Sequence, residues 1–172
     1  MSFFVISDLK MNDAIAAKSL GKTIEEYNNF IIEKWNSTVE EEDTVFIFGS
    51  FAKGTKEEVK SLISKMRGSL FLCSYSENDN IGYFTWRTIG IKRIWGCSFT
   101  ADVGEEKIFF PCKKELDNPY KYLAVTEKDN LNNVFENNKF SIEAKYWDYT
   151  PLRLKDLSDI ILRLEEFSKL EG

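Results

Sequence analysis

The sequence predicts a single α/β domain, and three observations lead to this prediction. In the first half, short apolar segments alternate with amphipathic ones, which is typical of a parallel sheet whose strands are joined by helices. The second half is rich in short β-prone segments and ends in a long amphipathic stretch. The chain has 172 residues, 43% of them hydrophobic, which suffices for one sizeable core but not for two. We therefore expect one domain over residues 1–172.

The first half is expected to form three strands and two helices. β-branched and aromatic residues dominate the strand segments. Each helix begins at a capping box, in which a threonine and a glutamate three residues later satisfy amides of the first turn. The predicted elements are strands over 3–7, 44–48 and 70–73 and helices over 24–36 and 56–67.

The second half is expected to form a further sheet and a final helix. The predicted elements are strands over 88–94, 95–101, 107–110, 120–125 and 140–146 and a helix from about 154 to 170. A hairpin turn is predicted at residues 103–106. Five aromatic residues of this half either fill the core or form a patch for a protein partner: Trp86, Trp95, Phe99, Phe109 and Phe110.

Composition limits the classes of partner and compartment. The net charge is −5, from 28 acidic and 23 basic residues, which argues against the basic surface of a general nucleic-acid binder. The cysteines, Cys73, Cys97 and Cys112, lack C-x-x-C spacing, which argues against a disulfide framework or a zinc site and favours a reducing compartment. No apolar segment has the length of a signal-peptide core or of a membrane span. We expect a cytoplasmic protein without a membrane partner.

Histidine is absent from the whole chain. Its absence excludes Ser-His-Asp and Cys-His mechanisms, because both need imidazole as the general base. It also removes the ligand that most often holds a transition metal in proteins. Any metal site would have to be built from carboxylates and other oxygen ligands.

Four segments nevertheless carry the pattern of a known enzyme family. They are residues 4–8, 33–37, 43–49 with Phe51, and 146–152. In these segments the chain resembles the small calcineurin-like metallophosphoesterases of bacteria and phages, over residues 3–78 and 139–157. The resemblance implies a calcineurin-like four-layer sandwich, with two mixed β-sheets packed face to face and flanked by helices.

The resemblance also implies where a two-metal site would lie. The family draws its ligands from the motifs D-x-H, G-D and G-N-H-D and from later histidines that include a G-H-x-H pair, and its metals activate water and clamp the phosphoryl group. Asp8 matches the first aspartate, but Lys10 stands in place of the histidine of D-x-H. Gly49 is retained, whereas Ser50 replaces the aspartate of G-D.

The later motifs have changed in the same way. The positions that correspond to them are occupied by Ser76, Glu77, Asn78, Cys112, Thr126 and Lys128. A one-residue shift brings Asp79 into the G-N-H-D region, and neither alignment restores a histidine. Lys10 and Lys128 cannot coordinate a cation when protonated. We therefore expect their ammonium groups to occupy the space of the metals and to pair with Asp8.

The leading hypothesis is a pseudoenzyme with a remodelled site, no catalytic residue and no cofactor. Such a protein acts by binding a protein partner or a small anionic ligand, and Lys10 and Lys128 could form the anion pocket. The alternative is that these residues have only structural roles: Asp8 caps a loop, both lysines are solvated, and Cys112 is a packed thiol.

Two other functions stay open. One is a metal-dependent phosphoesterase with a reduced site of Asp8, Glu77 and Asp79 that binds Mn²⁺ or Mg²⁺ weakly. Against it, the segment from Glu77 to Asp79 also fits an acidic loop that merely contacts water. The other is a structural protein that self-associates into a homo-oligomer.

Overall fold

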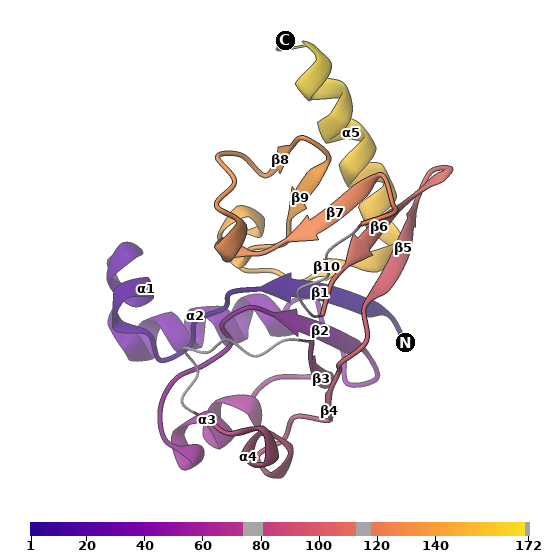
Figure 1. The fold of residues 1–172 in the computed structure, drawn as a ribbon. Coiled ribbons are helices and arrows are strands. Elements are labelled where there is room, and N and C mark those ends of the chain that lie inside the picture. Colours follow the sequence, from indigo (N-terminus) through magenta and orange to yellow (C-terminus); the bar gives the residue numbers. More distant parts are fainter. Residues whose placement is uncertain (74–80, 113–117, 171–172) are drawn as a thin grey trace.

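Two five-stranded sheets lie at the centre of the protein, whose structure is a computed structural model (Figure 1). The structure describes residues 1–73, 81–112 and 118–170. The strands are β1 (Phe3–Ser7), β2 (Thr44–Phe48), β3 (Ser69–Leu72), β4 (Arg93–Ile94), β5 (Phe99–Val103), β6 (Glu106–Phe110), β7 (Tyr122–Val125), β8 (Phe135–Glu136), β9 (Lys139–Ser141) and β10 (Leu152–Arg153). The helices are α1 (Ala14–Ser19), α2 (Ile24–Asn36), α3 (Lys56–Ile63), α4 (Tyr83–Thr88) and α5 (Leu157–Leu170), with 3₁₀ turns η1 (Glu127–Asp129), η2 (Ala144–Trp147) and η3 (Leu154–Asp156).

Both sheets are mixed and are flanked by helices, as predicted. The first has the order β10-β1-β2-β3-β4, in which β1 to β4 run parallel and β10 is antiparallel. The second has the order β5-β6-β7-β9-β8, with parallel pairs at its centre and antiparallel pairs at both edges. The N–H of Ser7 donates to the carbonyl of Ile142 at 2.8 Å. This bond joins the end of β1 to the segment that follows β9.

Side chains of the first sheet alternate between two hydrophobic clusters, because successive residues of a strand point to opposite faces. In β2, Val45 and Ile47 face the cluster beneath the helices, which includes Trp35 of α2. Phe46 and Phe48 face the second sheet and belong to the cluster between the sheets. Both faces of this sheet are therefore buried, which explains why β1 and β2 read as almost continuous apolar runs.

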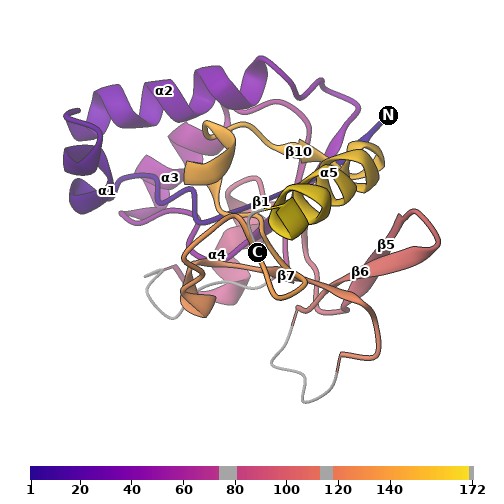
Figure 2. The same ribbon diagram turned by 90° about the horizontal axis from the view of Figure 1, so that it is seen from above.

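The place of α5 differs from the predicted four layers. Leu157 and Ile161 of this helix are fully buried in the same cluster as Val103, Ile108 and Tyr122 of the second sheet. The helix therefore lies against the inner face of the second sheet, beside the first sheet and beyond its edge strand β10 (Figures 1 and 2). The first sheet ends at β10, and the apolar surface of the second sheet extends beyond that edge. Helix α5 shields this surface from solvent.

Several segments differ from the predicted secondary structure, among them the unpredicted short strands β8 and β10 and the strand β5, which is predicted over 95–101. No element is predicted for α1, which forms because the Asp13 carboxylate accepts from the amides of Ile15 and Ala16 and caps the helix. Helix α4 precedes the predicted strand at 88–94, of which β4 is the extended part. The predicted strand at 140–146 ends with β9, because the chain turns into η2 and the indole N–H of Trp147 donates back to the Ser141 carbonyl at 2.8 Å.

The five aromatic residues considered above for a partner patch belong to the core or pack against it. Trp86 and Phe110 are fully buried, and Phe109 is nearly so. Trp95 and Phe99 are partly buried and pack against the cluster between the sheets. None of the described helices combines the length and apolar character needed to cross a membrane.

Candidate functional site

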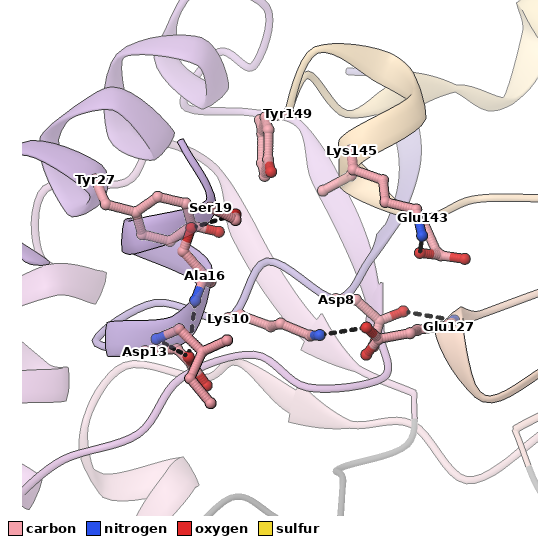
Figure 3. Close-up of a pocket in the computed structure, with 12 residues that line it drawn as sticks. Asp8, Lys10, Asp13, Ala16, Ser19, Tyr27, Glu127, Glu143, Lys145 and Tyr149 are labelled. Atoms are coloured by element: carbon pink, nitrogen blue, oxygen red, sulfur yellow. Dashed lines mark hydrogen bonds and ion pairs between the residues drawn. The ribbon is translucent and has the colours of Figure 1, made fainter. Parts of the chain in front are cut away.

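Polar side chains gather where the carboxyl ends of β1, β2, β7 and β9 meet. Two adjoining cavities of about 320 Å³ and 120 Å³ lie there. Both are lined by Asp8, Lys10, Asp13 and Glu127. The larger cavity extends between α1, α2 and η2 (Figure 3). Open α/β sheets commonly bind ligands at the carboxyl ends of their strands, so this is the candidate functional site.

The carboxylate of Asp8 holds three segments of the site together. Its Oδ1 accepts from the backbone N–H of Ser50 at 3.1 Å. Its Oδ2 accepts from the N–H of Glu127 at 3.0 Å and from the hydroxyl of Ser7 at 2.6 Å. The loop after β2 and the turn η1 are thereby fixed to the end of β1. Asp8 is thus a structural anchor as well as part of the cavity wall.

Glycine is required at position 49 because the Asp8 carboxylate lies against it. Gly49 has a φ of +63°, which side chains rarely adopt. A Cβ atom added to Gly49 would lie 2.2 Å from Asp8 Oδ1. The retained glycine therefore makes room for the aspartate and lets the chain turn at the end of β2.

Three lysines pair with the other carboxylates of the site. Lys10 Nζ lies 2.5 Å from Glu127 Oε1, Lys53 Nζ lies 2.6 Å from Asp13 Oδ2, and Lys145 Nζ lies 2.8 Å from Glu143 Oε2. Asp8 forms an ion pair with neither Lys10 nor Lys128, so both predicted pairs are wrong. Amide and hydroxyl donors occupy the Asp8 oxygens, and η1 offers the Glu127 carboxylate to Lys10 instead.

In two of these pairs the carboxylate is buried and the lysine faces solvent. The side chain of Asp13 is 9% exposed against 42% for Lys53, and Glu143 is 5% exposed against 53% for Lys145. Burial alone would raise the pKa of Asp13, but hydrogen bonds from Lys53 and from two backbone amides hold it below its usual value. The hydrogen bond to Glu143 raises the pKa of Lys145. Asp13 and Lys145 therefore stay charged at neutral pH.

Tyr27 and Tyr149 form an aromatic wall of the larger cavity. Their rings meet edge to face, with centroids 6.0 Å apart. Burial raises the pKa of the Tyr27 hydroxyl, which donates to the carbonyl of Leu9 at 2.7 Å. Tyr149 points into the cavity (Figure 3) and packs on Phe30 from behind. This wall is aromatic, whereas the wall across from it is ionic.

Backbone strain concentrates at the site. Among the described residues, four that are neither glycine nor asparagine have positive φ: Asp8, Lys10, Asp148 and Tyr149. Three of them line the cavities, and Asp148 directly precedes Tyr149. A left-handed conformation costs such residues roughly 1–2 kcal/mol each. Strain of this kind persists where the surrounding structure holds side chains in a particular place.

The structure brings some of the predicted site residues together and leaves others apart. Asp8, Lys10, Ser50 and Lys128 line the cavities. Thr126 is the residue before η1 and caps this turn, and it is not among the lining residues of the two cavities. Ser76, Glu77, Asn78 and Asp79 lie outside the described residues, and so do two of the three ligands of the alternative metal site.

Cys112 lies apart from the cavities, buried between the two sheets. Burial and a hydrogen bond with the Cys112 thiol raise the pKa of Cys73. Thiols in such surroundings are poor nucleophiles, because the thiolate is the reactive form. The interpretation of Cys112 as a packed thiol therefore fits its position.

The sequence prediction missed several residues of the site. They are Asp13, Tyr27, Lys53, Glu127, Glu143, Lys145 and Tyr149. Glu127 lies between two positions that the family pattern marked, so its segment was identified although the residue was not. Asp13 also carries a local signal, since an aspartate before an alanine-rich stretch is typical of a helix cap. Tyr149 lies in the segment 146–152 that resembles the family, but the pattern does not mark it as a site residue. The others come from segments that no motif connects.

The described residues of the site do not provide the donors of a two-metal centre. The described part of the chain contains no group of three or more carboxylates, thiols and imidazoles that could hold a metal ion. The carboxylates of the site accept from amides or pair with ammonium groups, and an ammonium group beside a carboxylate repels a cation. This donor set suits an ion-pair network.

Comparison with known proteins identifies the fold but no family. No family model matches the sequence, and a search of the curated proteins finds no significant match. Among solved structures, the chain is similar to the crystal structure of a protein of unknown function, AQ665 from Aquifex aeolicus. The two share 13% sequence identity with a TM-score of 0.64, over 92% of this chain and 98% of that one. The likeness concerns the fold alone.

Substitution of Gly49 by alanine should weaken the anchor at Asp8. We expect Gly21→Ala, at a φ of +64° with no atom within 4 Å, to cost about 1–2 kcal/mol from backbone strain alone. Gly49→Ala should cost about 2 kcal/mol more, because its Cβ overlaps the Asp8 carboxylate. Free energies of unfolding from urea titrations measure both variants. Equal losses would contradict the close approach of Asp8 to Gly49.

Acid should remove the stabilisation that the Asp13 carboxylate supplies. Because its pKa is lower in the folded than in the unfolded protein, this stabilisation is complete above the unfolded-state pKa of about 3.9 and is lost as pH falls through the folded-state pKa. Asp13→Asn keeps a helix-capping side chain without the charge. The stability difference between wild type and variant should shrink from about pH 7 to about pH 3. A constant difference would show that the charge contributes nothing.

Proposed function

We propose that this protein is a catalytically degenerate relative of the calcineurin-like metallophosphoesterases and that it acts by binding and not by hydrolysis. Its two facing mixed sheets and the segments that resemble the family support the relationship. The altered ligand positions support the loss of catalysis. A binding role also agrees with the strained residues that line the cavities, since a disused site has no reason to keep such strain.

One observation carries the proposal: each carboxylate that lines the cavities is neutralised by the protein itself. Asp13, Glu127 and Glu143 pair with lysines, and Asp8 accepts from two amides and a hydroxyl. A divalent metal would have to displace these donors and approach fixed ammonium groups. Without the metal, the site has neither a Lewis acid nor an activated water for phosphoester cleavage.

Lys10 has a central part in this neutralisation. It stands where the family pattern requires a histidine, and its ammonium group reaches from the loop after β1 to Glu127 beyond β7. Its positive charge takes over part of the role of a metal, because it holds together carboxylate-bearing segments from the two sheets. Lys128 adds a further exposed ammonium group at the smaller cavity.

Metal titration and phosphatase assays test the proposal together. We expect no stabilising binding of Mn²⁺ or Zn²⁺ by calorimetry or in thermal unfolding. We also expect no turnover of 4-nitrophenyl phosphate or of bis(4-nitrophenyl) phosphate with Mn²⁺, Ni²⁺ or Mg²⁺. An active metallophosphoesterase in the same buffers serves as the positive control.

The variant Asp8→Asn distinguishes genuine activity from contamination. Turnover that the wild type shows and Asp8→Asn lacks would contradict the proposal and would favour the phosphoesterase with a reduced metal site. Turnover that is equal in both proteins would come from a contaminating enzyme. Tight metal binding that stabilises the wild type would also overturn the proposal.

A further inference from the structure

We infer that the larger cavity binds a small organic anion, with the anionic group on Lys145 and Lys10 and the body of the ligand against Tyr149 and α1. The inference rests on the proposed function, because it names the class of ligand that the non-catalytic site would take. Neither Lys145 nor Tyr149 belongs to the positions at which the family pattern places its metal ligands. The site therefore uses residues that the resemblance does not assign.

Lys145 is positioned for this role by a buried carboxylate. Glu143 follows β9, its side chain is 5% exposed, and it accepts from the Lys145 ammonium group at 2.8 Å. The Ser141 hydroxyl lies 3.5 Å from the same carboxylate. A lysine ammonium group has three N–H donors, so the pair with Glu143 fixes the group and leaves donors for a ligand. Lys10 is held in the same way by Glu127.

The depth of the charges at Lys145 favours an anion over a cation. Lys145 and Lys10 are the two lysines that line the larger cavity. The Lys145 side chain is 53% exposed above a Glu143 carboxylate that is 5% exposed, whereas Lys10 is 28% exposed and its partner Glu127 46%. Attraction falls with distance, so a ligand that approaches Lys145 from solvent meets its ammonium group before the carboxylate behind it, and Lys10 is a second, deeper ammonium group.

The volume and the apolar lining favour an organic ligand over a bare inorganic anion. The cavity of about 320 Å³ is within the range of roughly 300–1,000 Å³ that is typical of sites for small organic molecules. Tyr27, Tyr149 and the α1 residues Ile15 and Ala16 also line the cavity. Tyr149 lies beside Lys145, and Tyr27 and Ala16 lie across from it (Figure 3). These side chains offer rings and methyl groups to the body of a ligand.

Ligand-observed NMR and calorimetry with three probes of the same ring test the inference. The probes are 4-nitrophenyl phosphate, 4-nitrobenzoate and the uncharged 4-nitrobenzyl alcohol. We expect at least one of the two anions to bind without being hydrolysed and the alcohol to bind at least about tenfold more weakly, the usual effect of losing a charge-assisted hydrogen bond. Comparison of the affinities for 4-nitrophenyl phosphate and 4-nitrobenzoate shows whether the site prefers a phosphate or a carboxylate group.

A matched pair of lysine variants locates the binding. Lys121 lies outside the cavity but has similar surroundings: it pairs with Glu165 at 3.0 Å and lies 4.8 Å from the ring of Tyr122, against 4.9 Å between Lys145 and Tyr146. Lys145→Met should weaken anion binding at least about tenfold, and Lys121→Met should leave it unchanged. Lys145→Arg should retain binding, because it keeps the charge.

A cavity-filling variant tests the site without changing any charge. Ala16→Leu should abolish binding of the anion, since its longer side chain occupies the space between α1 and the lysines. Failure of both anions to bind the folded wild type, or equal binding by the Lys145→Met and wild-type proteins, would overturn the inference but not the proposed function. Hydrolysis of the phosphate probe that depends on Asp8 would overturn the proposed function.

Discussion

The hydrogen bonds to the Asp8 carboxylate are the constraint on which the site depends. They reach Ser7 at the end of β1, Ser50 in the loop after β2 and Glu127 in η1. Since β1 and β2 belong to one sheet and η1 follows a strand of the other, one side chain ties together the edges of both sheets. The left-handed backbone at Asp8 and the glycine at position 49 make this arrangement sterically possible.

The ion pairs around Asp8 follow from the cost of burying charge. A buried carboxylate destabilises the fold strongly unless a positive group or several donors neutralise it. Here Asp13 and Glu143 are buried and each has a lysine above it. In metal-binding sites a cation supplies that neutralisation. Lysines supply it in this chain, so the carboxylates persist in a site that we propose to be without metal.

Much of the fold could be predicted because its signals are local. The two capping boxes place the starts of α2 and α3, and the apolar runs place β1 and β2. Prediction failed where distant contacts decide the local conformation. Residues 142–146 have the composition of a strand, but the end of β1 pairs with Glu143 and the chain then turns into η2.

The site was predictable only in part, for a related reason. Asp8 and Lys10 stand out because the family pattern has metal ligands at both positions, and the lysine in place of a ligand led to the prediction that it pairs with Asp8. Both residues have left-handed backbone conformations, and Lys10 reaches a carboxylate that is 117 positions away. Glu143, Lys145 and Tyr149 join the cavity from the other end of the chain, and no local pattern indicates that α2 and η2 face each other.

The central claim is that ammonium groups and amides, and not divalent metals, neutralise the carboxylates around Asp8. Anomalous diffraction from crystals soaked in manganese tests it most directly. The account predicts no anomalous peak within coordination distance of Asp8, Glu127 or Asp13, with the Lys10 and Lys53 ion pairs intact. A manganese ion bonded to Asp8, with Lys10 displaced from Glu127, would contradict it.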